Sequence, residues 1–382
     1  MIENSLDTNQ MYRLPWSKED NPSGWIEVTT FCQLKCPGCY RGLAEKNPIR
    51  IHEDLEKIKS EIDLLISSRN IQTLSIAGGE PLLYPKIKEV VEYASSKGVK
   101  TKIFTNGVLL TENKLRELKK AGVTEFVIHI DKYQIRPDMK KLKNTNELRE
   151  KLCRIFREVK DVNLGFILPV SGDDYSDLSD AIEICKKNCD IVNLLVLSPY
   201  KDVLINENKT FIENKLANPD IKQLSEFLSE QFKSKPCAFL GKIYSKDQPA
   251  WIFMVPVFYG ERIIGYLDFF LYKKFQERYR KKKGKHFITV KGNKINPNSL
   301  LPFIFRKNAA EILRNIRNEK KNNPDKNLDL RYQVILIIDG PERINGKWNL
   351  CDGCPDAMYY NGKLVPSCLL ERIKAGEDIF ID

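Results

Sequence analysis

Three cysteines lie within eight residues, at Cys32, Cys36 and Cys39, in the stretch FCQLKCPGCYRG. They follow directly on a β-forming run, GWIEVTTF, and loops after parallel strands gather at the carboxyl edge of an α/β sheet. A structural zinc ion takes four protein ligands, so three thiols leave it one short. A [4Fe–4S] cube held by three thiolates instead keeps its fourth iron open to a non-protein ligand. The spacing therefore favours such a cluster over an incidental group of cysteines or a zinc site completed by a distant residue.

Two further motifs follow the next two β-forming runs. GGEP, from Gly78 to Pro81, ends the run TLSIAGG, and TNG, from Thr105 to Gly107, ends the run KTKIFTNG. Glycines let a backbone approach a ligand closely, and a carboxylate such as that of Glu80 accepts charge-assisted hydrogen bonds from an ammonium group. Taken alone, GGEP is equally compatible with a tight turn that has no function.

A second cysteine group, Cys351, Cys354 and Cys368, surrounds the stretch AMYYNGKLVP. Asn361-Gly362 between apolar runs predicts a hairpin with a type I′ turn. Pairing Tyr360 with Lys363 in that hairpin makes Cys354 and Cys368 cross-strand neighbours. This pairing predicts a metal site at the base of the hairpin, with Cys237 as a possible fourth ligand, although spacing alone does not distinguish zinc from iron and sulfur.

The elements that must position these groups alternate along the first half of the chain. Six short β-forming runs between residues 24 and 199 are separated by helical patterns, one of which places Leu55, Ile58 and Ile62 on a single stripe. Thr111 can cap the helix ENKLRELKKA, and Gly122 stands where that helix should end. Strands that alternate with helices predict an α/β fold with right-handed crossovers and a parallel sheet, open or curled into a partial barrel.

The alternation of strand and helix patterns ends after residue 236. The runs AWIFMVPVFY and RIIGYLDFFLY predict a hairpin around Gly260-Glu261. The basic run RYRKKKGK, which follows, is predicted to be a loop, and HFITV is predicted to be a strand. Residues 309–318 are predicted to form a helix, and YQVILIID is predicted to form a buried strand. The expected units are an N-terminal extension over 1–23, an α/β barrel unit over 24–235, an α+β middle segment over 236–330 and a cysteine-containing C-terminal region over 331–382.

Three motifs follow successive strands in the order first cysteine motif, GGEP and TNG. In this order and at these strand ends, they resemble the motifs of the radical S-adenosylmethionine (SAM) superfamily. The resemblance covers roughly the first 200 residues and implies a partial (β/α)6 barrel of the TIM type. It implies that the first cysteine group binds a [4Fe–4S] cluster whose open iron is chelated by SAM. One electron then yields a 5′-deoxyadenosyl radical, which takes a hydrogen atom from an unactivated C–H position. It further implies reduced flavodoxin or ferredoxin as the electron donor. The residues expected to contact SAM are Gly78, Gly79, Glu80, Asn106, Asp131 and Tyr40.

The C-terminal region loosely resembles the SPASM or twitch extensions that carry auxiliary iron–sulfur clusters in many of these enzymes. The resemblance implies a second cluster on the second cysteine group. The substrate is open, and a ribosomal peptide, a lipid, a cofactor precursor and RNA are alternatives. No catalytic acid or base can be named. His129 is the best placed of the three histidines, and a core role explains it equally well.

Composition limits the remaining choices. The chain has 382 residues, ten cysteines and a formal net charge of +11. It shows no secretory signal and no apolar run near the roughly 18 residues of a membrane span, so we expect a cytoplasmic protein with reduced thiols. The basic run, residues 278–285, could contact nucleic acid, which leaves a non-catalytic zinc and nucleic-acid-binding protein as the alternative from another class.

Overall fold

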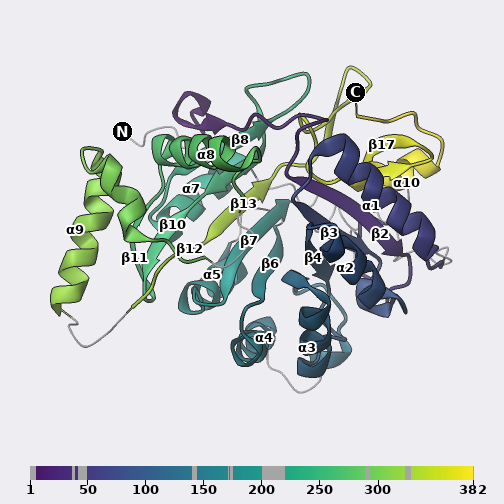
Figure 1. Ribbon diagram of the computed structural model, residues 1–382, viewed down its shortest axis with the longest axis horizontal. Coiled ribbons are helices and arrows are strands. Elements are labelled where there is room, and N and C mark those ends of the chain that lie inside the picture. The colour runs from purple at the N-terminus through teal and green to yellow at the C-terminus, as the bar shows by residue number, and fades with distance from the viewer. Residues whose placement is uncertain are drawn as a thin grey trace.

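Strands that follow one another in the first half of the chain also lie side by side in one sheet (Figure 1). The computed structural model describes residues 6–36, 39–41, 50–139, 144–170, 172, 175–199, 220–288, 293–322 and 328–381. The six strands of the first half of the chain are all parallel, and they lie in the sheet in the order β2-β3-β4-β5-β6-β7. Their bounds are β2 Ser23–Thr29, β3 Thr73–Gly78, β4 Lys100–Thr105, β5 Val123–His129, β6 Asn163–Val170 and β7 Val192–Pro199.

Helices separate these strands where the sequence predicts them. Their bounds are α1 Leu55–Arg69, α2 Ile87–Ser96, α3 Glu112–Ala121, α4 Thr145–Val159, α5 Ser176–Lys187 and α7 Ile221–Phe232. The predicted cap of α3 is confirmed, since the side chain of Thr111 accepts from the N–H of Lys114 and Gly122 ends the helix at φ 113°.

The two faces of the sheet differ in their packing and polarity, as the residues of β4 show. Ile103 is buried in the large apolar core, which also contains helix residues such as Val90 and Leu115. The neighbouring Lys102 and Phe104 point the other way, since successive strand residues alternate between faces. The sheet therefore has a helix-covered outer face and a partly polar inner face, which confirms the predicted partial (β/α)6 barrel.

The sheet continues beyond β7 with strands from the second half of the chain. Next to β7 lies β13 (Val334–Ile338), which is parallel to it, followed by the antiparallel β9 (Pro249–Met254). The strands β8 (Pro236–Gly241) and β1 (Tyr12–Arg13) complete a ten-stranded sheet. The run YQVILIID is the buried strand that the sequence predicts, and its neighbour β7 comes from the first half of the chain.

The remainder of the middle segment differs in part from the predictions. The hairpin around Gly260 is confirmed as β10 (Pro256–Tyr259) and β11 (Arg262–Tyr266), joined by β12 (Leu330–Tyr332) into a small sheet. The run DFFLY, predicted as strand, instead begins helix α8 (Phe269–Lys283), because the side chain of Asp268 caps its first turn. The predicted helix over 309–318 is confirmed as α9 (Lys307–Asn322).

The prediction of a basic loop is also wrong in part. Most of the basic run forms the last turns of α8, which ends at Gly284 with φ 65°. Lysine and arginine at the end of a helix are favoured by its macrodipole, a tendency that outweighs their mutual repulsion here. The run HFITV forms no strand over residues 286–288, and its last two residues lie outside the described ranges.

The C-terminal region packs beside the first strand of the barrel. Its bounds are β14 Glu342–Ile344, β15 Lys347–Asn349, β16 Ala357–Tyr360, β17 Lys363–Pro366 and α10 Leu370–Lys374. β16 packs against β2 and α1, on the side of the barrel where the parallel sheet ends (Figure 1). The predicted hairpin register is confirmed, with Tyr360 opposite Lys363 and positive φ at both turn residues.

Short 3-10 turns complete the secondary structure, at Thr8–Gln10, Pro81–Leu83, Pro137–Met139, Pro297–Phe303 and Ser367–Leu369. Within the described ranges, no helix combines the length and the apolar character needed to cross a membrane.

Candidate active site

The glycines of GGEP draw the start of the first cysteine loop against β3. The N–H of Gly79 donates to the carbonyl of Thr29 at 2.7 Å, and the N–H of Glu80 donates to the carbonyl of Phe31 at 2.7 Å. A Cβ at Gly78, where φ is 130°, would lie 2.3 Å from the oxygen of Thr29. Only glycine permits this approach, so the motif is required to hold the loop that begins with Cys32.

Glu80 joins the second motif to the third. Its carboxylate is fully buried and accepts from the hydroxyl of Thr105 at 2.6 Å, the N–H of Asn106 at 2.8 Å and the N–H of Leu82 at 3.0 Å. Burial raises the pKa of Glu80, and these three hydrogen bonds oppose the rise. A carboxylate has about four acceptor positions, so three are used within the protein and one is left for a ligand.

Side-chain amides reach two of the three thiols of the first cysteine group. The amide of Asn106 lies 3.8 Å from the sulfur of Cys32, which also accepts from the N–H of Leu34 at 3.4 Å. The amide of Gln134 lies 3.6 Å from the sulfur of Cys36. Burial raises the pKa of Cys32 and takes that of Cys36 to about 12, and the neighbouring Cys39 contributes in both cases. The three predicted cysteines are therefore brought together.

Asp131 lies at the same edge, as predicted, and is held by its neighbours. Its carboxylate pairs with Nε2 of His129 at 2.7 Å and accepts from the N–H groups of Tyr133 and Gln134 at 2.6 and 3.1 Å. Burial acts to raise the pKa of Asp131, but these partners outweigh it and the pKa is lowered. Asp131 is therefore an ionised acceptor near Cys36, and His129 is its partner.

Arg136 is a site residue that sequence reasoning missed. Its buried guanidinium donates to the carbonyl of Asn106 at 2.8 Å and to the side-chain oxygen of Gln134 at 2.9 Å, and it pairs with Asp138 at 2.8 Å. It therefore fixes the side-chain amide of Gln134 and the backbone of Asn106. No motif marks Arg136, and the only signal available was its position five residues after Asp131.

Tyr40 and Arg41 turn from the cysteine loop towards the inner face of the barrel. The hydroxyl of Tyr40 donates to Glu27 at 3.4 Å, and Arg41 pairs with Glu27 at 2.7 Å and also with Glu371 of α10. Burial raises the pKa of Glu27 despite the nearby Arg41. This buried network was not predicted, and it connects the first cysteine loop to the C-terminal region.

The donor set of the first cysteine group fits an iron–sulfur cluster. Three thiols lie at one sheet edge, and amide groups donate towards the sulfurs, as at the sulfurs of such clusters. Across the described residues, no three or more His, Cys, Asp or Glu side chains are gathered tightly enough to hold one metal ion. A cube binds each thiolate through a different iron and therefore needs its cysteines further apart than a single zinc ion does.

The second cysteine group lies beside the open edge of the barrel, with Cys354 buried and Cys351 and Cys368 half-buried. Its loop is held by Arg69 of α1, which donates to the carbonyls of Gly353 and Cys354 at 2.7 and 2.8 Å. Burial raises the pKa of all three thiols, to about 12 for Cys351, and Cys354 interacts with both Cys351 and Cys368. The structure therefore brings the three predicted cysteines together.

The prediction of Cys237 as a fourth ligand is corrected by its position. Cys237 lies near the start of β8, where its thiol donates to the carbonyl of Phe253. Lys242, five residues further along, is the β8 neighbour that bridges to Cys351. Five residues of strand span roughly 16 Å, which removes Cys237 from the second cysteine group.

The basic run makes contacts within the protein. Arg280 pairs with Asp20 at 2.6 Å, Lys285 donates to the carbonyl of Ile71 at 3.1 Å, and Arg278 stacks over Phe303. Part of its charge therefore fastens α8 to the amino-terminal ends of the barrel strands.

The comparisons with known proteins agree with this geometry. Residues 26–185 match the family model of the radical SAM superfamily. The chain is 25% identical over 206 residues to 7,8-dihydro-6-hydroxymethylpterin dimethyltransferase of Methanocaldococcus jannaschii, a match that covers 53% of this chain and 40% of that protein. It is 27% identical over 241 residues to GTP 3′,8-cyclase of Peptoclostridium acidaminophilum, covering 60% of this chain and 68% of that protein.

Among solved structures, Streptococcus suis SuiB bound to the precursor peptide SuiA matches with a TM-score of 0.44 and 17% identity, over 56% of this chain and 47% of that one. The chain spans less than half of the length of the dimethyltransferase. The family match and the ordered motifs define the class of this part of the chain: residues 26–185 form a radical SAM domain. Because the radical SAM superfamily is one of enzymes, the prediction of an enzyme is confirmed.

Proposed function

We propose that this chain cleaves SAM reductively at a [4Fe–4S] cluster held by Cys32, Cys36 and Cys39, and removes a hydrogen atom from an unactivated C–H position of its substrate. When bound, the cluster supplies the electron that splits SAM into methionine and a 5′-deoxyadenosyl radical. Reduced flavodoxin or ferredoxin is the proposed electron donor.

One observation carries this proposal, the hydrogen-bonded connection between the three motifs. Glu80 of GGEP binds the N–H of Asn106 in TNG, and the amide of Asn106 lies 3.8 Å from the sulfur of Cys32. A change in any one motif therefore moves the other two. Such a connection gives the thiols fixed positions before a ligand arrives, which lowers the cost of binding.

The remaining residues at the edge have separate proposed tasks. Gly78 and Gly79 hold the cysteine loop close to the edge at which SAM is proposed to bind, and the fourth acceptor position of Glu80 suits the ammonium group of SAM. Ionised Asp131 suits the ribose hydroxyls as an acceptor. Arg136 holds the side-chain amide of Gln134 and the backbone of Asn106 in place through the hydrogen bonds described above.

Side chains on the inner face of the barrel pack together beneath the sheet edge that carries the three motifs. The rings of Trp25 on β2 and Phe104 on β4 lie 4.9 Å apart, and Lys102 pairs with the buried Glu125 at 2.8 Å. Tyr40, Trp25 and Phe104 pack in one apolar group with Met358 and Val365 of the C-terminal region. We propose that this layer keeps water from the radical, which would otherwise lose its hydrogen-abstracting capacity in side reactions.

We propose that the second cysteine group holds an auxiliary iron–sulfur cluster. The support is the gathering of three thiols, one buried and two half-buried, beside the loop that Arg69 fastens to α1. Since Cys237 lies elsewhere, a ligand other than Cys237 completes the site.

The substrate class stays a prediction. A ribosomal peptide, a lipid and a cofactor precursor stay alternatives. The internal contacts of Arg278, Arg280 and Lys285 lower the case for RNA, because these side chains already have partners in the protein.

Formation of 5′-deoxyadenosine tests the proposal. The anaerobically reconstituted chain is incubated with SAM and dithionite, and the products are separated by chromatography. Wild-type protein should form 5′-deoxyadenosine and methionine, and Cys36→Ala should form neither. Cys153→Ala is the matched control, because Cys153 is buried in the main core away from both cysteine groups and should keep the activity. A wild-type chain with four irons in the first site and no product would contradict the proposal.

A further inference from the structure

A cavity of about 460 Å³ lies at the end of the barrel opposite to the cysteine loop. It is lined by Ser23, Thr73 and Lys100, the first residues of β2, β3 and β4. The three motifs follow the other ends of these strands. From Thr73 to Gly78 the strand β3 runs five residues, roughly 16 Å, so the cavity is a separate compartment from the proposed SAM site.

The layer that closes the barrel interior lies between the two compartments. Lys102 lines the cavity, and the pairing of Lys102 with Glu125 together with the contact of Trp25 with Phe104 occupies the strand positions above it. A hydrogen atom is abstracted only at contact distance. A ligand confined to the cavity is therefore not the molecule from which the radical takes hydrogen.

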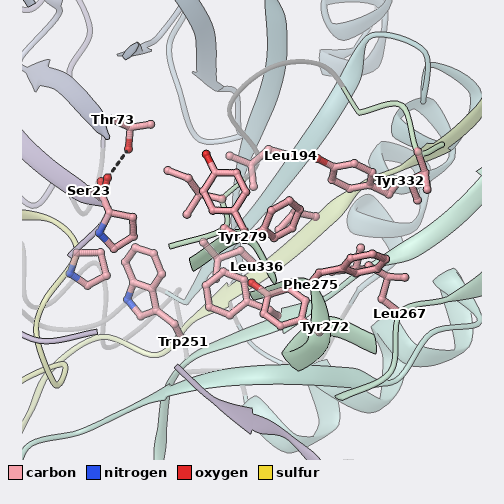
Figure 2. Close-up of a pocket in the computed structure, with 18 of the residues that line it drawn as sticks. Ser23, Thr73, Leu194, Trp251, Leu267, Tyr272, Phe275, Tyr279, Tyr332 and Leu336 are labelled. Carbon is pink, nitrogen blue, oxygen red and sulfur yellow. Dashed lines mark hydrogen bonds between the residues drawn. The ribbon is translucent and has the colours of Figure 1, made fainter. Parts of the chain in front are cut away.

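The size of the cavity is not explained by packing. Protein interiors leave few voids larger than a water molecule, and the amino-terminal end of a barrel usually serves stability alone. Binding pockets for small molecules have volumes of about 300 to 1,000 Å³. The cavity is in that range; it is partly open to solvent and is lined by α8, β9, β13 and residues that follow α8 (Figure 2).

Eight of the described residues that line the cavity carry aromatic rings. Figure 2 shows Trp251 of β9, Tyr272, Phe275 and Tyr279 of α8 and Tyr332 of β12 around the same space. Trp16, Phe253 and Phe287 also line it. Flat walls of this kind favour a planar aromatic ligand, which stacks on or meets their edges.

The polar groups of the wall point to a negative charge on that ligand. Among the described residues, the charged side chains that line the cavity are those of Lys100, Lys102 and Lys294. Lys102 is neutralised by Glu125, and Lys294 forms an exposed pair with Asp329 at 2.8 Å. Exposed pairs are weak, so the ammonium of Lys294 can turn to an anion in the cavity.

An unsatisfied donor supplies the second, independent observation. Trp16 is 7% exposed and lines the cavity, and its indole N–H has no hydrogen-bond partner among the described residues. A buried donor without a partner costs about 1 to 3 kcal/mol, and a ligand with an acceptor atom would remove that cost.

We propose that this cavity is a second ligand site, for a planar aromatic molecule that carries an anionic group, and that it acts apart from radical formation. Trp251 also contacts the second cysteine group, since it hydrogen-bonds to Cys351, and Pro355 of that loop lines the cavity. A ligand in the cavity would therefore contact residues that touch the second cysteine group. The proposed ligand site does not depend on the function proposed for the first cysteine group.

Equilibrium dialysis with two probes tests the proposal on the full chain. The probes are 1-anilinonaphthalene-8-sulfonate, an aromatic anion, and the uncharged N-phenyl-1-naphthylamine. We expect one molecule of the anion per folded chain, bound more tightly than the neutral probe. Cys36→Ala should bind both probes like wild type, which separates this site from the SAM site. More than one equivalent site, no saturation, or preference for the neutral probe would overturn the proposal.

Three variants locate the bound probe. Lys294→Gln should weaken binding of the anion about threefold, as for an exposed ion pair, and leave the neutral probe unchanged. Trp16→Phe keeps an aromatic ring but removes the N–H together with part of the indole, and should weaken the anion about fivefold relative to the neutral probe. Leu336→Phe fills the space and should abolish binding of both probes. Lys88→Gln, on the distant helix α2, is the control. Unchanged affinity in Lys294→Gln and Trp16→Phe together would overturn the assignment, whether or not Leu336→Phe folds.

Discussion

Replacing Gly79 by alanine should dislodge the first cysteine loop. The added Cβ would lie 2.4 Å from the oxygen of Phe31, 2.8 Å from its carbonyl carbon and 2.9 Å from the carbonyl carbon of Thr30. All three atoms belong to the backbone, so a side-chain rotation cannot relieve the clash. The chain must separate here, and the hydrogen bonds from Gly79 to Thr29 and from Glu80 to Phe31 are lost.

The magnitude follows from these contacts. Two backbone hydrogen bonds contribute about 1 kcal/mol each, and local strain brings the total loss of unfolding free energy to about 2 to 4 kcal/mol. Urea unfolding of the chain measures this loss, and iron analysis together with 5′-deoxyadenosine formation measures the loss at the first cysteine group. We expect a variant that folds but forms at least tenfold less product.

A second glycine provides the control. Gly98 has φ 76°, but a Cβ there would meet nothing within 4 Å. Gly98→Ala therefore carries only the cost of a left-handed alanine, about 1 to 2 kcal/mol, and should keep its iron and its activity. If Gly79→Ala keeps wild-type product formation, or if Gly98→Ala loses as much, the reasoning from close backbone approach is refuted.

Three further substitutions probe other parts of the account. Burial raises the pKa of Glu61 to about 7 from 4.5, so the folded state binds more protons than the unfolded state between these values and stability falls as pH rises through that window. Glu61→Gln should therefore stabilise the chain by up to about 3 kcal/mol at pH 8 and not at pH 4, as urea unfolding at both values would show. Arg69→Met leaves the carbonyls of Gly353 and Cys354 without their buried donor, and should cost about 2 to 4 kcal/mol and lower the iron content of the second site alone. Arg136→Met frees the side-chain amide of Gln134 and leaves the carbonyl of Asn106 without its buried donor, and should raise the KM for SAM about tenfold and cost about 2 to 4 kcal/mol of unfolding free energy.

Local signals were enough to predict the parallel sheet with its helices, and the resemblance carried by the three motifs added the partial barrel. Period-two runs, capping residues such as Thr111 and ordered motifs fix which segments are strands and where each strand ends. Because parallel strands end at one edge, the same signals place Cys36, Asn106 and Asp131 together. The Asn361-Gly362 turn likewise predicted the hairpin register and, through it, the neighbours Cys354 and Cys368.

The parts that could not be predicted depend on contacts between distant segments. Arg41 pairs with Glu371, 330 residues away, and β13 enters the sheet beside β7 without any local signature. Cys237 is a correction of the same kind, because only the register of β8 shows that it lies far from Cys351. Arg136 was missed since a lone arginine in a loop has no pattern, and the helical end of α8 was missed because a run of like charges suggested a loop.

The central claim is that three thiolates leave one iron open to SAM. Electron paramagnetic resonance of the dithionite-reduced chain tests it most directly, in a Cys351→Ala, Cys354→Ala and Cys368→Ala variant that lacks the second site. We predict a single reduced [4Fe–4S] signal whose g values shift when SAM is added, and no such signal after the further change Cys36→Ala. A signal that SAM leaves unchanged, or a colourless chain that holds zinc in place of iron, would contradict the account.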